Sequence, residues 1–80
     1  METIGQRVIG ALAKLQGINK SNMSIDADFF FDLEMDSLDR VEALTLLEQE
    51  FGMTIPLADA AKFSRVRDVV DYLTPHLGGA

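Results

Sequence analysis

A single serine, Ser37, stands between two aspartates in the stretch MDSLD, residues 35–39. A serine hydroxyl becomes a nucleophile when a base lies within hydrogen-bond reach and an oxyanion hole stabilises the product of its attack. The G-x-S-x-G turn that supplies such a hole has no counterpart here, because Met35 and Asp39 occupy the two glycine places. The one histidine, His76, lies in an expected solvated C-terminal region. These residues predict no catalytic site and argue against a serine hydrolase.

The acidic stretch DADFFFDLEMDS, residues 26–37, begins like a calcium-binding loop. Phe30 and Phe31 fill its fifth and sixth places, where an EF-hand needs an oxygen ligand and a glycine, and Ser37 replaces the final glutamate. The sequence therefore excludes an EF-hand and predicts no dedicated metal site. Loose binding of divalent cations to the carboxylates, as charge neutralisation, remains open.

Two interpretations of Ser37 then stand. In the first, it is simply a residue at the start of a helix and shares capping with Asp36. In the second, another protein modifies it, so that no internal base is needed. A phosphodiester attached at a helix start would lie near unpaired backbone amides, in favourable electrostatics.

Length and composition limit the kind of protein. Eighty residues make one small domain, too short for a deep, enclosed active site together with a scaffold that holds it. Because the chain has no cysteine, apolar packing must supply its stability. No apolar run approaches the roughly 18 residues of a membrane span, and the N-terminal stretch lacks a signal-peptide core. We therefore expect a soluble cytoplasmic protein.

Charge is concentrated around the serine. The net charge of −6 disfavours nucleic acid and anionic membranes as partners, because both would repel the chain. Residues 26–50 contain nine acids against one base, a local charge of −8. Such a run is typical of a solvated helix face, but it also fits a docking surface for basic partners.

Apolar periodicity predicts an all-α fold with three principal helices. The first begins after a capping box of Thr3 and Gln6 and ends at Gly17. The second begins at the N-cap Asp36 and ends at Gly52.

In this second helix, Leu44, Leu47 and Phe51 form one apolar stripe. Asp39 is well placed for the helix dipole. Asp36 and Arg40 have the acid-before-base spacing that favours an ion pair.

The last helix, with Val66, Val69 and Leu73 on one face, is expected to have Ser64 as its cap and to bend or fray at Pro75. A short helix is expected within Pro56–Lys62. The long connection from Asn19 to Met35 should pack on the core through some of its apolar residues. The candidates for that packing are Ile25, Phe29, Phe30 and Leu33.

The stretch DLEMDSLDRVEALTLLEQEFGMTIP, residues 32–56, resembles the core of an acyl carrier protein. The likeness extends to the opening helix and to the closing AAKFSRVRDVVDYL, and so covers nearly the whole chain. It implies a four-helix bundle over residues 1–77, with residues 78–80 as a flexible tail. It also implies that a phosphopantetheinyl transferase attaches 4′-phosphopantetheine to Ser37, and that the thiol of this arm carries acyl groups as thioesters.

The resemblance further implies a monomeric carrier, not an enzyme, that serves fatty acid, polyketide or specialised lipid synthesis. Its second helix would dock on basic patches of partner enzymes. Residues expected to contact partners are Asp36, Leu38, Asp39, Val41, Glu42 and Glu48, although Leu38 and Val41 also fit ordinary core positions. Residues that could line a cavity for the acyl chain are Leu47, Phe51, Ile55, Phe63 and Val69.

Two other functions remain open on the residues alone. The chain could carry aminoacyl or peptidyl groups, or act as an unmodified acidic interaction module. Some positions also depart from the common acyl carrier pattern. Glu34 stands where glycine is usual, Arg40 adds a positive charge to the acidic helix, and one of the phenylalanines at 29–31 is expected to be exposed. These departures suggest a specialised carrier with its own partners.

Overall fold

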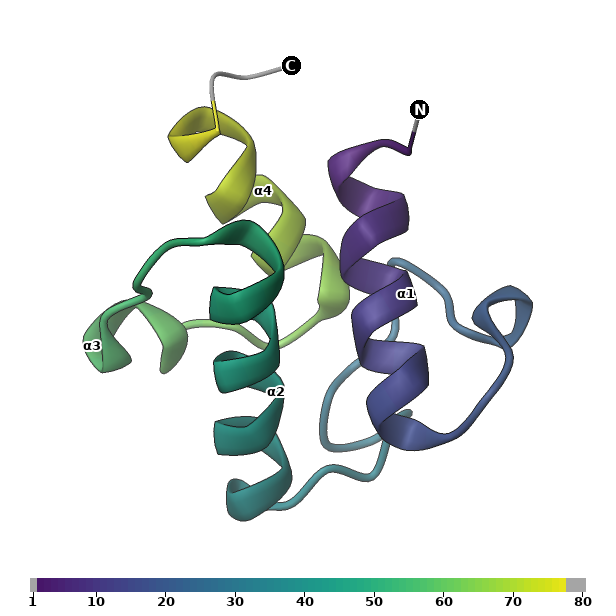
Figure 1. Ribbon diagram of the computed structural model, residues 1–80. Helices are drawn as coiled ribbons and strands as arrows, with labels where there is room; N and C mark the ends of the chain where they lie inside the picture. The colour runs from purple at the N-terminus through teal and green to yellow at the C-terminus, as the bar shows by residue number, and fades with distance from the viewer. Residues whose placement is uncertain (1, 78–80) are drawn as a thin grey trace.

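The computed structural model describes residues 2–77 and consists of four α-helices joined by loops (Figure 1). They are α1 (Ile4–Gln16), α2 (Ser37–Phe51), α3 (Leu57–Ala60) and α4 (Val66–His76), with a 3₁₀ turn at Lys20–Asn22. The prediction of an all-α fold with three principal helices, one short helix and a long first loop is confirmed. The expected flexible tail, residues 78–80, lies outside the described residues.

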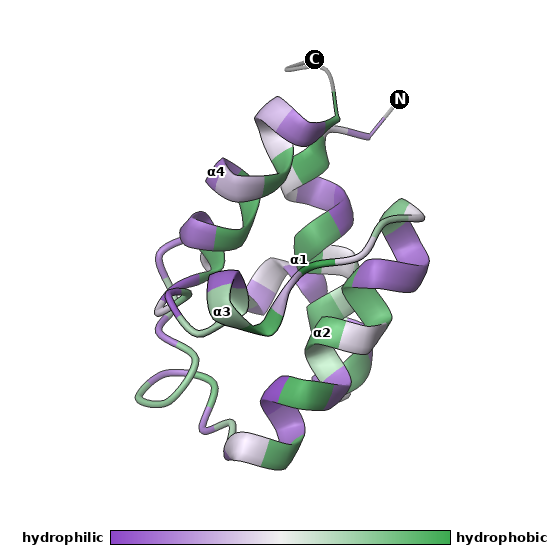
Figure 2. Cartoon of the chain, turned by 90° about the vertical axis from the view of Figure 1, so that its left-hand side faces the viewer, coloured by the Kyte–Doolittle hydropathy of each residue, from purple (hydrophilic) through white to green (hydrophobic). Residues whose placement is uncertain are grey.

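The other two long helices, α2 and α4, both pack on α1. The short helix α3 lies beside α2 and α4 on the side away from α1 (Figures 1 and 2). Fully buried side chains fill the centre, and the largest are Val8, Leu12, Met35, Val66, Val69 and Leu73. Among residues 2–77, no helix combines the length and apolar composition that crossing a membrane requires.

Local hydrogen bonds fix the ends of α1 as predicted. The Gln6 N–H donates to Thr3 Oγ1 at 3.1 Å, and the Thr3 N–H donates to Gln6 Oε1 at 2.8 Å. Gly17 closes the helix in the left-handed region, at φ 70°. The predicted capping box and stop of this helix are thus confirmed.

The start of α4 differs from the prediction. Ser64 does not cap the helix; the cap residue is Arg65. The first amides of the helix, those of Val66 and Arg67, donate to the carbonyls of Ala27 at 3.0 Å and Ile25 at 2.7 Å. Asp68 Oδ2 reaches back and accepts from the N–H groups of Ser64 at 2.8 Å and Arg65 at 3.0 Å. Both bonds favour the charged carboxylate and hold the pKa of Asp68 below its usual value.

The end of α4 is more regular than expected. Pro75 lies inside the helix, which runs on to His76, so the predicted fraying at the proline is not found. The helix retains its hydrogen bond beyond the proline, since the Leu77 N–H donates to Leu73 at 3.0 Å.

The long connection between α1 and α2 packs on the core and runs along the start of α4. The Val66 N–H donates to the Ala27 carbonyl at 3.0 Å, and the Phe29 N–H donates to Ser64 at 3.0 Å. Phe29 is buried and Leu33 is half-buried, as predicted. Buried residues of this segment that the prediction did not name are Met23, Ala27 and Met35.

The phenylalanine run is more exposed than expected. Phe31 is 87% exposed and Phe30 is 50% exposed, so two of the three rings reach solvent and Phe30 is not a core residue. Their backbone is held by Asp28, whose Oδ1 accepts from the N–H groups of Phe30 at 2.8 Å and Phe31 at 3.0 Å. The Asp28 N–H in turn donates to Asp32 at 2.7 Å. These carboxylates therefore shape the loop that leads to Ser37.

Candidate functional site

Ser37 is the first residue of α2, and its side chain is exposed. The cap before it is built by two aspartates. The Asp39 N–H donates to Asp36 Oδ1 at 2.8 Å, and the Asp36 N–H donates to Asp39 Oδ2 at 3.2 Å. Asp36 is therefore confirmed as the N-cap, and the Ser37 hydroxyl lies outside the capping box. An exposed hydroxyl at the first turn of a long helix suits an attached phosphodiester.

His76 is too far from Ser37 to act as its base. Ser37 begins α2 at one end of the bundle, whereas His76 ends α4 at the other end (Figure 1). The imidazole is occupied locally, because Nδ1 lies 2.7 Å from the Tyr72 carbonyl and the ring stacks on Tyr72 at 4.4 Å. Although exposed, His76 is a helical residue and not part of a frayed tail.

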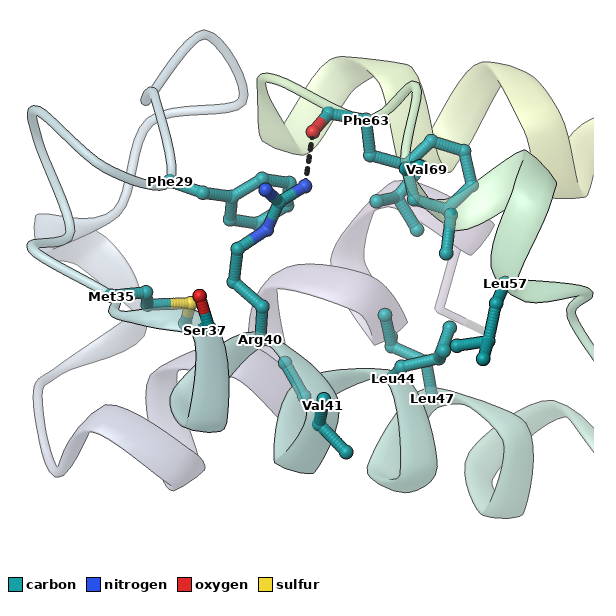
Figure 3. Close-up of a pocket in the computed structure, with 13 residues that line it drawn as sticks. Phe29, Met35, Ser37, Arg40, Val41, Leu44, Leu47, Leu57, Phe63 and Val69 are labelled. Carbon is teal, nitrogen blue, oxygen red and sulfur yellow. Dashed lines mark hydrogen bonds between the residues drawn. The ribbon is translucent and has the colours of Figure 1, made fainter.

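A pocket of about 230 Å³ opens beside Ser37, between α2 and the segment that contains α3 and α4. Figure 3 shows Ser37 and Arg40 at one end and Leu57 towards the other. Apolar groups form most of its lining, whose residues are Phe29, Met35, Ser37, Arg40, Val41, Ala43, Leu44, Leu47, Leu57, Ala60, Ala61, Phe63 and Val69.

The predicted cavity residues are only partly correct. Leu47, Phe63 and Val69 line the pocket, but Phe51 and Ile55 are buried elsewhere in the core. Periodicity could not separate these groups, because both are apolar and face inward. Phe29 and Met35, from the loop before Ser37, line the pocket as well.

Arg40 has a different partner from the one predicted. Its guanidinium donates from Nη2 to the Phe63 carbonyl at 2.6 Å. It also lies 4.7 Å from the centre of the Phe30 ring and 5.8 Å from that of Phe29. The predicted ion pair with Asp36 does not form, since Asp36 caps the helix and Arg40 turns into the pocket. The positive charge therefore does not lie on the acidic face.

The predicted partner-contact residues fall into two groups. Leu38 is 66% exposed and Val41 is 54% exposed, so neither is a core residue. Asp36 and Glu42 are also exposed.

The other two residues in this set are half-buried and have structural bonds. Asp39 belongs to the capping box, and Glu48 Oε2 accepts from the Ile55 N–H at 2.7 Å. Glu42 is therefore the acid whose change would disturb the helix least.

Glu34, two residues before the cap, adopts φ 53°. This left-handed conformation favours glycine, and most other residues adopt it at a cost of about 1–2 kcal/mol. Glu34 therefore adopts a backbone conformation that suits glycine, the residue that the resemblance led us to expect at this position.

Comparison with known proteins agrees with these features. A family model described as the phosphopantetheine attachment site matches residues 6–73, from α1 to within α4. The acyl carrier protein of Rickettsia bellii (strain RML369-C) is 40% identical over 76 residues, which cover 95% of this chain and 88% of that protein.

The helical fold and the matched attachment model define a phosphopantetheine-bearing carrier, not an enzyme. More narrowly, the chain belongs to the acyl carrier protein family. This membership favours acyl cargo over the two alternatives, a peptidyl carrier and an unmodified acidic module. It also implies that separate enzymes act on the carrier.

Proposed function

We propose that Ser37 is the residue that carries the 4′-phosphopantetheine arm, and that the thiol of this arm carries acyl groups as thioesters. The observation that supports this most directly is the position of Ser37. It is exposed at the first turn of α2, outside the capping box, and it lies at the end of an apolar pocket.

The attachment reaction follows from the chemistry of an alcohol and a pyrophosphate. The Ser37 oxygen forms a bond to the pantetheine-side phosphorus of coenzyme A, and the bond from that phosphorus to the bridging oxygen breaks. The adenosine bisphosphate leaves with the electron pair, while a phosphopantetheinyl transferase accepts the serine proton. The carrier contributes the hydroxyl and the positive end of α2, which favours the negative phosphodiester.

The pocket is the proposed shelter for the acyl chain. Its lining beyond Arg40 is apolar, with Leu44 and Leu47 from α2 opposite Phe63 and Val69 (Figure 3). Moving an alkyl chain from water into such a lining is favourable by about 0.8 kcal/mol for each buried CH₂ group. A chain held there would be shielded until a partner enzyme draws it out.

The exposed face of α2 is the proposed docking surface. Asp36 and Glu42 supply negative charge there, while Leu38 and Val41 supply exposed apolar area. Opposite charge on a partner speeds encounter more than it tightens the complex, which suits a carrier that must be released. We expect the carrier to act as a monomer in the cytoplasm, with basic patches on its partners.

Mass spectrometry tests the attachment site. Incubation with coenzyme A and a phosphopantetheinyl transferase should add one phosphopantetheine to the chain and none to Ser37→Ala. Ser64→Ala is the matched control, because Ser64 is an exposed serine outside α2, and it should be modified as the unchanged chain is. No addition with several active transferases, or equal addition to Ser37→Ala, would contradict the proposal.

A further inference from the structure

One side chain connects the two walls of the pocket. Among residues 2–77, a single hydrogen bond joins α2 to the segment from Leu57 to Leu77, and it runs from Arg40 to the Phe63 carbonyl. The helices α2 and α4 each pack on α1, and the pocket lies between them. Beside Ser37, this bond is therefore the direct hydrogen-bonded link between the two walls.

The position of Arg40 places it across the path from Ser37 to the interior. Both side chains project from the same side of α2, as a spacing of three residues in a helix requires. In Figure 3 the Arg40 side chain rises from α2 between Ser37 and the residues Leu44 and Leu47, and its guanidinium lies against Phe29 at the Phe63 carbonyl. The direct way along α2 from Ser37 to Leu44 and Leu47 therefore runs past Arg40.

The hydrogen bond from Arg40 to the Phe63 carbonyl is charge-assisted, but no ion pair within the described residues reinforces it, so it can be broken. It is short, at 2.6 Å, and its donor is charged, but no carboxylate in residues 2–77 lies within 4.0 Å to form an ion pair with Arg40. The flat guanidinium rests against Phe30 and Phe29, which restrict its motion.

We infer that Arg40 is a specificity-determining residue that acts as a strap across the mouth of the pocket. It admits unbranched acyl chains and resists broad ones, such as those that end in an aromatic ring. This inference rests on the proposed attachment of the arm to Ser37. Its basis in the sequence is a departure from the common pattern, because Arg40 places a cation within an acidic helix.

Arg7 provides a matched control, since it makes the same kinds of contact elsewhere. Its Nη2 donates to the Glu50 carbonyl at 2.9 Å, and its guanidinium lies 4.4 Å from the centre of the Phe51 ring. These contacts join α1 to α2 and do not line the pocket beside Ser37. Arg7→Met thus removes similar interactions without opening that pocket.

The experiment loads the chain, Arg40→Met and Arg7→Met with octanoyl or 4-phenylbutanoyl arms from the corresponding coenzyme A thioesters. After the masses confirm loading, the rate of thioester cleavage by hydroxylamine measures how far each cargo is shielded. In Arg40→Met, cleavage of the phenylbutanoyl thioester should slow by about tenfold, the factor that corresponds to about 1.4 kcal/mol. The octanoyl rate should change little, and Arg7→Met should behave as the unchanged chain does.

A second measurement locates the cargo directly. A phenyl ring inside the pocket shifts the NMR signals of nearby methyl groups, so the Val69 methyls should move with phenylbutanoyl cargo in Arg40→Met and not in the unchanged chain. Arg40→Lys, which keeps the charge but lacks the flat fork, should give an intermediate result.

The outcomes separate the two claims. If the masses show the arm on Ser37 but both cargoes behave alike with and without Arg40, the strap is wrong and the attachment site stands. If no arm is found on Ser37, the proposed function is wrong, and the inference about Arg40 is wrong as well. Equal changes in Arg7→Met and Arg40→Met would also overturn the strap.

Discussion

The two sides of α2 use the same residue type in different ways. Towards α1, Arg7 donates to the Glu50 carbonyl and pairs with its carboxylate at 3.1 Å, while its guanidinium covers Phe51. Towards α3 and α4, Arg40 donates to one carbonyl and rests on two rings, with a pocket behind it. An arginine that covers a packed interface stays in place, whereas an arginine that covers a pocket can be displaced.

Packing explains the difference. Protein interiors are nearly as dense as organic crystals, so widening a filled interface creates a void and loses contacts along its whole length. A pocket already lacks those contacts, and opening it further loses little besides the bonds that span it. This difference supports the proposal that cargo enters on the pocket side of α2, where no filled interface has to open.

The largest effect should come from truncating a side chain in the packed interior. Leu12, in α1, is fully buried, so Leu12→Ala should lower the free energy of unfolding by about 2–5 kcal/mol. Leu44→Ala, in the pocket lining, should lower it by about 1 kcal/mol, because Leu44 is half-buried and borders existing space. Urea unfolding measures both. Equal losses would remove the distinction between the two sides.

A smaller effect concerns the backbone beside the Phe63 carbonyl, the group that accepts the hydrogen bond from Arg40. Asp68 holds the backbone of Ser64 and Arg65, next to the Phe63 carbonyl. Asp68→Ala should therefore lower the free energy of unfolding near neutral pH by about 1 kcal/mol, a usual loss for a capping interaction. Asp71→Ala, which removes an exposed carboxylate from the same helix, should have less effect.

This loss should depend on pH. Since the folded chain lowers the pKa of Asp68, its contribution is complete above the unfolded pKa of about 3.9 and disappears as the pH falls through the folded value. The stabilities of the chain and Asp68→Ala, measured by urea unfolding across acidic pH, should converge. A constant difference down to the most acidic pH would show that the charge is not the cause.

The smallest effect concerns the exposed face of α2, which contacts neither α1 nor the segment that contains α3 and α4. Glu42→Lys should slow attachment of the arm by the transferase several-fold at low salt, because it replaces attraction with repulsion during encounter. High salt should reduce the difference through screening. Asp71→Lys makes the same change of charge on α4, and should leave the rate nearly unaltered. Equal slowing by both would indicate a general effect of net charge.

Local features of this molecule could be predicted from the sequence, and distant contacts could not. The Thr3–Gln6 capping box and the N-cap Asp36 were predicted, because each lies within one helical turn and needs no tertiary contact. The ion pair of Asp36 with Arg40 was also local, but it does not form, because Arg40 bonds to the distant Phe63 carbonyl. The prediction for the start of α4 was wrong for the same reason. Ser64 fits the statistics of a cap, but the first amides of the helix, those of Val66 and Arg67, donate to the distant carbonyls of Ala27 and Ile25.

The candidate site shows the same division. The exposure and helix position of Ser37 agree with the motif around it. The partner of Arg40 is a backbone carbonyl 23 positions away, and every residue has such a carbonyl, so no side-chain pattern marks it. Similarly, Phe51 and Leu47 share one apolar stripe, and only the arrangement of the helices decides which of them meets the pocket.

The ends of the bundle have a practical consequence. The start of α1 and the end of α4 lie together, and Ser37 lies at the opposite end (Figure 1). A surface tether or fused protein joined beyond either of these helices would therefore leave Ser37, the proposed attachment site, and the mouth of the pocket pointing outward. The bundle can be displayed on a support, or built into a chain of linked enzymes, in a single orientation that keeps its cargo within reach.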